Sequence, residues 1–383
     1  MNIKEIGEIR RRQRRDRSNM TAIYGCYIND NKEIISEFRQ STGMMPENEA
    51  EKYFALLRRS LGGTLGRNLI DISFATSQVA GSPEHKLLMD LRGCKVADEE
   101  IRMAFYKKVM ESLDLDCSYV ILLGCDTYDV PFKSKDGDTQ SDNSEETYTY
   151  ILCAICPVKQ TKATLHYIPE SKEFHDGNMA NVISAPELGF LFPAFDNRAT
   201  NIYNALFYNR SPKDNHAALA DALFKVEIPM PVAQQKDAFA ALLHNALQEE
   251  CSLDVVQSVH EELCQQIAMH KESKIPDALQ TDKEQVKQIL EGCGVSDERV
   301  AKFSVDYDSV FGFEAAIHPV NVIDHKKIEV KTPDVLIKVA ADRGDLIETR
   351  VIGGVPYILI RADENVEVNG VDIHVEERET ATV

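Results

Sequence analysis

The protein has 383 residues, of which 43% are hydrophobic and 27% charged, and its formal net charge at pH 7 is −19. This composition indicates a globular protein of two or three domains, and its acidity excludes a protein that coats nucleic acid with its whole surface. No apolar run approaches the roughly 18 residues of a membrane helix, and the charged start from Lys4 onward is unlike a signal peptide. With nine scattered cysteines, we expect a cytosolic protein with reduced thiols and no membrane contact.

A basic segment opens this acidic chain. Isoleucines at positions 3, 6 and 9 recur with helical spacing and predict a helix over residues 2–17, with an apolar stripe that stops at Ile9. Six arginines follow within eight residues: Arg10, Arg11, Arg12, Arg14, Arg15 and Arg17. Residues 1–17 carry a net charge of +4, which leaves −23 for the rest of the chain.

Two interpretations fit the arginine segment. A short basic run can hold the phosphates of RNA or DNA, or an acidic protein surface. The same run can instead be an intramolecular strap, because the acidic body offers many carboxylates. The aromatic residues that often accompany nucleic-acid contacts are missing before Tyr24.

The next elements alternate between strands and helices. Two β-rich runs flank Asn29-Asp30-Asn31 and predict a hairpin, and residues 47–61 predict a helix that starts after Pro46. Further along, the patterns predict a strand at 67–75, helices near 84–91 and 97–113, a buried strand at 118–126 and a polar loop over 133–146.

The stretch LGGTLGRNL, residues 61–69, holds a Gly-x-x-Gly pattern. Gly63 and Gly66, followed by Arg67, have the form of the loop with which KH-type modules clamp an RNA backbone. A helix cap followed by a turn into the next strand explains the same glycines without a ligand.

Asp126 and Asp129 follow the buried strand at 118–126. Carboxylates at the end of a strand can hold Mg²⁺ or Mn²⁺ and support phosphoester hydrolysis, with Asp136, Asp138 and Asp142 as additional ligands. Aspartates that end a strand and solvate a loop are the alternative. Beyond this Mg²⁺ hypothesis the sequence predicts no cofactor.

Cysteine and histidine pairs are the remaining motifs. Cys153 and Cys156 form a Cys-x-x-Cys within an apolar strand, where residues three apart face opposite sides, so we interpret both as buried structural cysteines. His260 and Cys264 lie one helical turn apart and could begin a zinc site, with His270 further along. No second pair is evident, and a solvated helix face is the simpler interpretation.

The fold class predicted from these elements is α+β. It comprises a mixed, layered N-terminal and central α/β region, a helical segment and a small C-terminal antiparallel β module. Hairpin turns are expected at Gly353-Gly354 and Asn369-Gly370, and residues 328–339, with Pro333, predict an edge strand. The expected segments are 1–150 with the basic leading helix, 151–232 rich in strands, 233–315 helical, and 316–383.

Several stretches, among them GTLGRNL, YILCAICPV and ELGFLFPAFDNRATNIYNALFYNR, resemble a family of uncharacterised proteins of anaerobic low-GC Gram-positive bacteria, a domain of unknown function. The resemblance covers nearly the whole chain. It implies a cytosolic bacterial protein and supplies no catalytic residue.

Three hypotheses follow. The first is a non-catalytic binding protein whose basic helix contacts RNA or an acidic partner. The second is a metal-dependent phosphoester hydrolase that uses Asp126 and Asp129. The third is a structural or assembly protein. The sequence decides neither whether the protein is an enzyme nor its oligomeric state.

Overall fold

The computed structural model describes residues 1–133, 139–161, 164–177, 179–211, 213–228, 230–313, 315–362, 366–368 and 370–373. The chain divides into two compact units. Unit 1 comprises Met1–Gln234 with Pro276–Ala278, and unit 2 comprises Gln235–Ile275 with Leu279–Val383. The four segments expected from the sequence are a finer division and stay a prediction.

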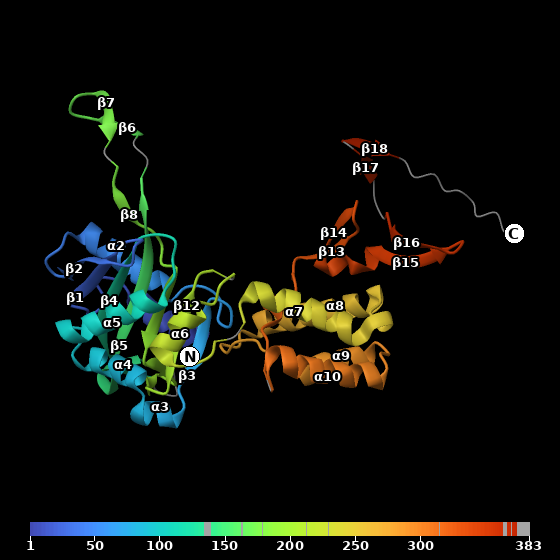
Figure 1. The fold of residues 1–383 in the computed structure, drawn as a ribbon, viewed down its shortest axis with the longest axis horizontal. Helices are drawn as coiled ribbons and strands as arrows, with labels where there is room; N and C mark the ends of the chain where they lie inside the picture. Colours follow the sequence, from blue (N-terminus) through green and yellow to red (C-terminus); the bar gives the residue numbers. More distant parts are fainter. Residues whose placement is uncertain are drawn as a thin grey trace. The chain divides into compact units, whose positions relative to one another are not determined.

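An antiparallel sheet is the centre of unit 1 (Figure 1). Its strand order is β2-β1-β4-β5-β9-β12-β3, and β8 pairs with the far part of β5. The strands of this sheet are β1 (Ala22–Ile28), β2 (Ile34–Ser41), β3 (Leu69–Ser73), β4 (Tyr119–Lys133), β5 (Thr139–Gln160), β8 (Asn181–Ile183), β9 (Leu188–Phe192) and β12 (Asn204–Asn209). Two small hairpins accompany it: β6 (Thr164–Ile168) with β7 (Glu173–Gly177), and β10 (Ala194–Asp196) with β11 (Ala199–Asn201).

Helices cover both faces of this sheet. Successive side chains of a strand point to opposite faces, so Ile121 and Leu123 of β4 enter one core while Val120 and Leu122 enter the other. The first core lies under α3 (Thr76–Gly81), α4 (Pro83–Gly93), α5 (Glu99–Ser112) and α6 (Ala217–Phe224). The second lies under α1 (Ile3–Arg12) and α2 (Glu47–Arg59). Unit 1 is therefore a three-layer sandwich with a doubly covered sheet, and the predicted α+β class is confirmed.

The predicted hairpin around residues 29–31 and the helix over 47–61 are confirmed by β1–β2 and α2. The loop expected over 133–146 is wrong for most of its length, because β5 begins at Thr139 and pairs with β4 as far as Lys133. Main-chain hydrogen bonds extend the β4–β5 ladder beyond the apolar core. The first residues of β5 are therefore polar and lack the alternation of apolar side chains that would predict a strand. Residues 134–138 lie outside the described part.

Helices form the core of unit 2. They are α7 (Val232–Leu247), α8 (Leu253–Ser273), α9 (Lys283–Gly292), α10 (Asp297–Phe311) and α11 (Pro319–Val322), with short 3₁₀ turns η1 (Gln248–Glu250) and η2 (Ala341–Leu346). Phe239, Leu263, Leu290, Phe303 and Tyr307 are buried together between them. On α7 the buried residues Phe239, Leu243 and Ala246 recur every three or four positions, so this helix follows the periodicity seen in the sequence.

Three successive hairpins make the β part of unit 2. They are β13 (Lys327–Lys331) with β14 (Leu336–Ala340), β15 (Ile347–Ile352) with β16 (Val355–Ile360), and β17 (Val366–Val368) with β18 (Val371–Ile373). The edge strand expected over 328–339 is wrong: Pro333 lies between β13 and β14, because proline suits a turn better than a paired strand. The turn at Gly353-Gly354 is confirmed by positive φ angles of 59° and 81°. Asn369 of the other expected turn lies outside the described residues.

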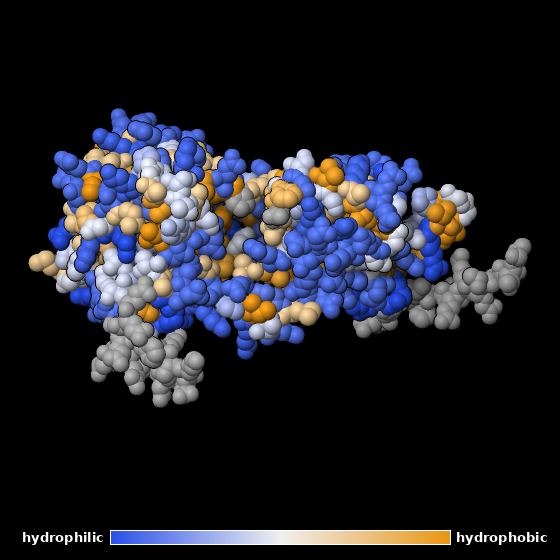
Figure 2. All heavy atoms as spheres, turned by 90° about the horizontal axis from the view of Figure 1, so that it is seen from below, coloured by the Kyte–Doolittle hydropathy of each residue, from blue (hydrophilic) through white to orange (hydrophobic). Residues whose placement is uncertain are grey.

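Apolar side chains of these hairpins remain exposed. Val351 is 72% exposed and Val355 is 52% exposed. Figure 2 shows a mostly hydrophilic surface with orange patches, one of them at the position of the β15–β16 hairpin. Isolated two-stranded hairpins are marginally stable, so the helical core supplies most of the stability of unit 2. Within the described residues, no helix is long and apolar enough to cross a membrane.

Candidate functional site

The basic N-terminal segment starts as a capped helix. Asn2 Oδ1 accepts hydrogen bonds from the backbone N–H groups of Lys4 and Glu5, and the Glu5 carboxylate accepts one from the N–H of Asn2 at 2.8 Å. This reciprocal capping box fixes where α1 begins. Ile6 and Ile9 are buried against the sheet and dock the helix on unit 1 as the sequence predicts, whereas Ile3 of the same stripe is 52% exposed.

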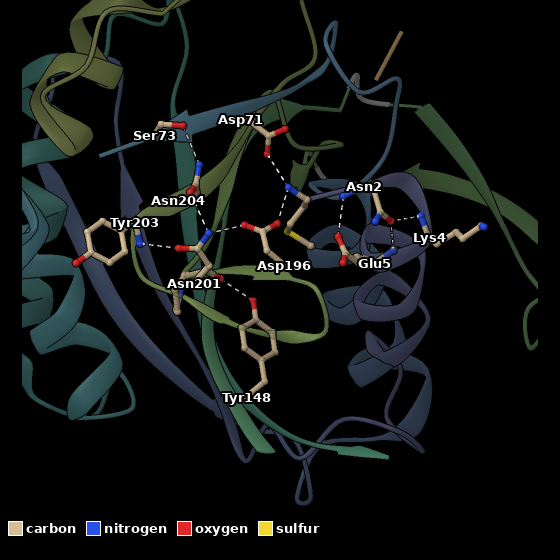
Figure 3. Close-up of polar contacts among 12 residues, drawn as sticks. Asn2, Lys4, Glu5, Asp71, Ser73, Tyr148, Asp196, Asn201, Tyr203 and Asn204 are labelled. Atoms are coloured by element: carbon tan, nitrogen blue, oxygen red, sulfur yellow. Dashed lines mark hydrogen bonds and ion pairs between the residues drawn. The ribbon is translucent and has the colours of Figure 1, made fainter. Parts of the chain in front are cut away.

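Acidic residues of β3 and β10 meet the beginning of α1 (Figure 3). The amino group of Met1 lies 3.2 Å from Asp71 and 2.7 Å from Asp196. Burial lowers the pKa of this amino group, but its hydrogen bonds and ion pairs with Asp196 and Asp71 outweigh that effect and raise the pKa overall. Asn201 donates to Asp196 at 2.6 Å, which ties the β10–β11 hairpin to the same end of the helix.

The helix ends earlier than predicted, at Arg12 instead of residue 17. Gln13 follows with φ −71° and ψ 67°, and its side chain is fully buried. Its Nε2 donates to the hydroxyl of Tyr150 at 2.7 Å, and that hydroxyl donates to Asp126 Oδ2 at 2.9 Å. The helix therefore ends where the side chain of Gln13 enters the core and hydrogen-bonds to Tyr150, which in turn hydrogen-bonds to Asp126.

Asp126 is the end point of these contacts and is only 1% exposed. Its Oδ1 accepts hydrogen bonds from the backbone N–H groups of Asn19 and Thr127, each at 2.8 Å. Its Oδ2 accepts the Tyr150 hydroxyl and lies 3.6 Å from Arg12 Nη2. This carboxylate is thus partnered on both oxygens by unit 1 itself.

Arg12 is the arginine that faces inward. Its side chain is 16% exposed, and its guanidinium carbon lies 4.2 Å from the centre of the Tyr128 ring. Tyr128 in turn donates to Glu8 at 2.7 Å, and Arg198 donates to the same carboxylate at 2.7 Å. The structure therefore joins two residues that the sequence assigned to different sites, Arg12 of the arginine segment and Asp126 of the metal hypothesis.

Asp126 and Asp129 do not come together. They are three residues apart on β4, so they point to opposite faces, and Asp129 is exposed with Thr147 donating to it at 3.1 Å. Asp136 and Asp138 lie outside the described residues, as does the side chain of Asp142. Among the side chains that the structure describes, no group of three or more His, Cys, Asp or Glu residues could hold a metal ion.

The remaining arginines divide into exposed and partly covered ones. Four are exposed: Arg10, Arg11, Arg14 and Arg17. Arg17 lies 3.7 Å from Asp16, whereas Arg10, Arg11 and Arg14 have no carboxylate within 4.0 Å among the described residues. Arg15 is half-buried, and its backbone N–H donates to Glu51 of α2.

The basic end of α2 joins this surface. Arg58 Nη1 donates to the backbone carbonyl of Gln13 at 3.4 Å, which brings Arg58 beside the arginine segment. Arg59 follows it and is exposed. Two helices that are separate in sequence therefore contribute positive charge to one side of unit 1.

The glycine loop after α2 is held together by its own hydrogen bonds. Gly63 has φ 111° and Gly66 has φ 78°, so both positions favour glycine. The N–H groups of Arg67 and Asn68 donate to Thr64 O at 3.1 and 2.9 Å, and Gly66 donates to Leu69 O at 2.8 Å. This turn accounts for Gly63, Gly66 and Arg67 without a phosphate, and a phosphate-binding role for them stays a prediction.

The predicted structural role of Cys153 and Cys156 is confirmed. Both are fully buried, and they lie in the two different cores on either side of the sheet. Burial raises the pKa of Cys156 to about 12, so the thiol stays protonated.

The family model described as Domain of unknown function (DUF4317) matches residues 1–371. The chain belongs to this family. No match was found among curated proteins or solved structures. The match extends over both units, which confirms the full-length resemblance seen in the sequence motifs.

Sequence reasoning missed several residues that organise the arginine segment in this DUF4317 chain. Tyr150, Tyr128 and Arg198 lie more than 100 positions from the residues of the N-terminal segment that they contact. One local signal was present: Gln13 continues the isoleucine face one turn beyond Ile9, and a polar residue on a buried stripe indicates a buried hydrogen-bond partner.

Proposed function

We propose that this DUF4317 protein binds RNA through the exposed arginines of its N-terminal segment. The proposal rests on one observation: a single arginine of the segment points into unit 1, while most of the others stay exposed. The acidic body takes Arg12 inward onto Asp126 and Tyr128, yet leaves Arg10, Arg11 and Arg14 exposed, with no carboxylate partner among the side chains that the structure describes. An intramolecular strap that used all six arginines would pair them with the body, which carries a net charge of −23.

The way in which α1 is anchored on unit 1 supports this role. Ile6, Ile9 and Gln13 are buried, and the α1 cap is complete, so the arginines project from an ordered support. An ordered support lowers the entropy cost of binding, and arginine matches phosphate oxygens with a planar fork of donors. The backbone of RNA carries a negative charge at every nucleotide, so several of these closely spaced arginines can bind it at once.

A bacterial, cytosolic setting belongs to the same proposal. All nine cysteines are unpaired thiols in the structure, which supports a reducing compartment. RNA is available to a cytosolic protein there.

Substitution tests the proposal better than deletion, because removing residues 1–17 would also remove Ile6 and Ile9 from the core. We expect Arg10→Gln/Arg11→Gln/Arg14→Gln to weaken binding of a labelled structured RNA, measured by fluorescence anisotropy at two salt concentrations. Each arginine–phosphate pair that the substitutions remove should also flatten the slope of log affinity against log salt by about 0.7 to 0.9.

A matched control removes the same charge elsewhere. Lys86, Lys95 and Lys107 are exposed on the α4–α5 side of the sheet, and their replacement by glutamine should leave RNA affinity nearly unchanged. Equal affinity of the arginine variant and the wild type would overturn the proposal. Binding of polyglutamate in place of RNA would also overturn it and would favour an acidic protein partner.

A further inference from the structure

A cysteine and a histidine on α8 are hydrogen-bonded to each other. Cys264 Sγ lies 3.7 Å from His260 Nδ1, and His260 Nε2 lies 3.0 Å from the backbone carbonyl of Asp324. A carbonyl oxygen only accepts hydrogen bonds, so the ring proton is on Nε2 and the lone pair of Nδ1 accepts the thiol proton. In the part of the chain that the structure describes, no other cysteine has a histidine as its hydrogen-bond partner.

The carbonyl that orients His260 is itself held in place. Asp324 O also accepts the backbone N–H of Lys327 at 3.3 Å, and Asp324 Oδ1 accepts the backbone N–H of Lys326 at 3.1 Å. The loop after α11 therefore holds the imidazole against α8, and the one-turn spacing of His260 and Cys264 sets the thiol at Nδ1. A base that is bound to a nucleophile on one side and to a fixed acceptor on the other is the arrangement that activates the nucleophile.

A pocket of about 290 Å³ opens on the thiol. Residues of α8, the loop after α11 and η2 line it: Glu261, Cys264, His325, Lys326, Ala341 and Asp342. His260 is not part of this lining, so the base lies behind the thiol and a small molecule in the pocket meets Sγ first. Two carboxylates and one ammonium group give the lining a formal charge of −1 with neutral imidazole, which favours a cationic ligand over an anionic one.

The negative charge around the thiol determines how it can react. Burial raises the pKa of Cys264, and the negative charges of Asp324 and Glu261 raise it further. A free thiolate is therefore scarce at neutral pH, and the sulfur reacts efficiently only if a base takes its proton during the attack. His260 Nδ1 is placed to take that proton, and the same carboxylates stabilise the imidazolium that results.

We propose that Cys264 undergoes thiol–disulfide exchange with small cationic disulfides, with His260 as its general base. Cys264 Sγ attacks one sulfur of the disulfide while the thiol proton moves to His260 Nδ1, and the S–S bond of the disulfide breaks. The leaving thiolate takes the proton from the imidazolium, so Cys264 is oxidised to a mixed disulfide and the leaving sulfur is reduced to a thiol. A second thiol reverses the exchange, which makes the modification reversible. It is independent of RNA binding by unit 1.

Reaction of the full chain with cystamine, a dicationic disulfide, tests the proposal. Peptide mapping by mass spectrometry gives the rate at which each cysteine of the folded wild type gains a cysteamine group. We expect Cys264 to react faster than Cys251 and Cys293, which are half-buried cysteines of the same unit outside the pocket lining. Dithiodipropionate, a dianion of similar length, should react more slowly than cystamine at Cys264 when each rate is divided by that of the urea-unfolded chain.

Histidine variants test the role of the base. His260→Ala should slow the reaction of Cys264 at neutral pH at least about 10-fold, and its rate should then rise about tenfold per pH unit, because only the free thiolate reacts. The wild-type rate should depend less steeply on pH. His244→Ala removes an exposed histidine of α7 and should leave the rate unchanged, and far-ultraviolet circular dichroism checks that each variant folds.

Three results would overturn the proposal. The first is a Cys264 in the wild type that reacts no faster than Cys251 and Cys293, a comparison that needs no variant. The second is an equal rate in the wild type and in folded His260→Ala. The third is a normalised rate that is higher for the dianion, which would exclude cationic disulfides as the ligand class.

Discussion

Asp126 determines how the arginine segment is divided between the inside and the outside of unit 1. Its Oδ2 receives the Tyr150 hydroxyl, and through it Gln13, while Arg12 Nη2 lies 3.6 Å away. These contacts end α1 and direct the following residues along α2. A carboxylate with this many internal partners acts as a structural anchor, and the exposed arginines depend on it for their placement.

Replacement of Asp126 by asparagine should destabilise unit 1. The substitution leaves Arg12 without its ion pair and sets an amide N–H₂ against a hydroxyl, and breaking a buried pair costs about 3 kcal/mol or more. Urea unfolding measures the difference. Asp129→Asn is the control, because Asp129 is exposed and should change stability by less than about 0.5 kcal/mol.

The same pair of variants tests the metal-dependent hydrolase. If Asp126 held Mg²⁺, the wild type would gain about 2.7 kcal/mol at a hundredfold excess of metal over the dissociation constant. We expect no such gain. A stabilisation by Mg²⁺ that Asp126→Asn abolishes would contradict the anchor role and restore the hydrolase.

Sequence analysis assigned Arg12 to a nucleic acid or an acidic partner, and Asp126 to a metal ion, so it did not predict that the two residues contact each other. They are 114 positions apart, and no local pattern reports such a separation. Asp126 and Tyr150 are direct cross-strand partners, a relation that depends on the β4–β5 register and is invisible without it. Long-range pairing, and not residue type, was the missing information.

Elements with a strong local pattern were predictable. The β1–β2 hairpin and α2 follow alternation and helical spacing, and β9 pairs with β12 as two neighbouring apolar runs. Two predictions were wrong where the apolar pattern is weak. The early part of β5 is polar and is defined by its main-chain ladder, so it was predicted as a loop. The first helix was predicted to continue to residue 17, but α1 ends at Arg12, next to the buried Gln13. Tertiary hydrogen bonds override local propensity in both cases.

Gly189 in β9 shows how closely the elements of the sandwich approach one another. A Cβ atom there would lie 2.4 Å from the carbonyl oxygen of Cys153 and 2.7 Å from Ser60 Cβ. Because a strand carbonyl cannot move aside cheaply, Gly189→Ala should cost about 1 to 3 kcal/mol of stability.

Thermal and urea unfolding of Gly189→Ala measure this cost. Gly93→Ala serves as the control, since nothing lies within 4 Å of its added Cβ at the end of α4. Alanine there should be neutral or stabilising by up to about 1 kcal/mol. Equal stability of the two variants would mean that the sheet centre adjusts more easily than the structure indicates.

For the whole molecule, composition and element order were sufficient for the α+β class, but not for the architecture of unit 1. The order β2-β1-β4-β5-β9-β12-β3 inserts later strands between β1 and β3. The two hydrophobic faces of each central strand explain the near-continuous apolar runs in β4 and β9, and β4 confirms the buried strand predicted at 118–126. Sheet order requires long-range contacts that a single sequence does not contain.

Buried hydroxyls and thiols are spread through both units and make the whole protein sensitive to alkaline pH. Burial raises the pKa of Tyr119, Tyr128 and Tyr307 to about 12, from an ordinary value of 10.0. Burial also raises the pKa of Cys26 and Cys125 from 9.0 to about 12. In each case the folded state keeps a proton that the unfolded chain releases.

Stability should therefore be fully present below about pH 9 and fall as the pH rises from about 9 to 12, by up to about 1.4 kcal/mol per pH unit for each such group. Urea unfolding across this range, with tyrosinate absorbance recorded in parallel, measures the slope. Tyr128→Phe removes one titrating group from unit 1, so it should make the alkaline decline shallower while Tyr307 continues to contribute in unit 2. A stability that stays constant to pH 12, or tyrosinate absorbance that develops fully near pH 10 in the folded protein, would contradict the burial of these hydroxyls.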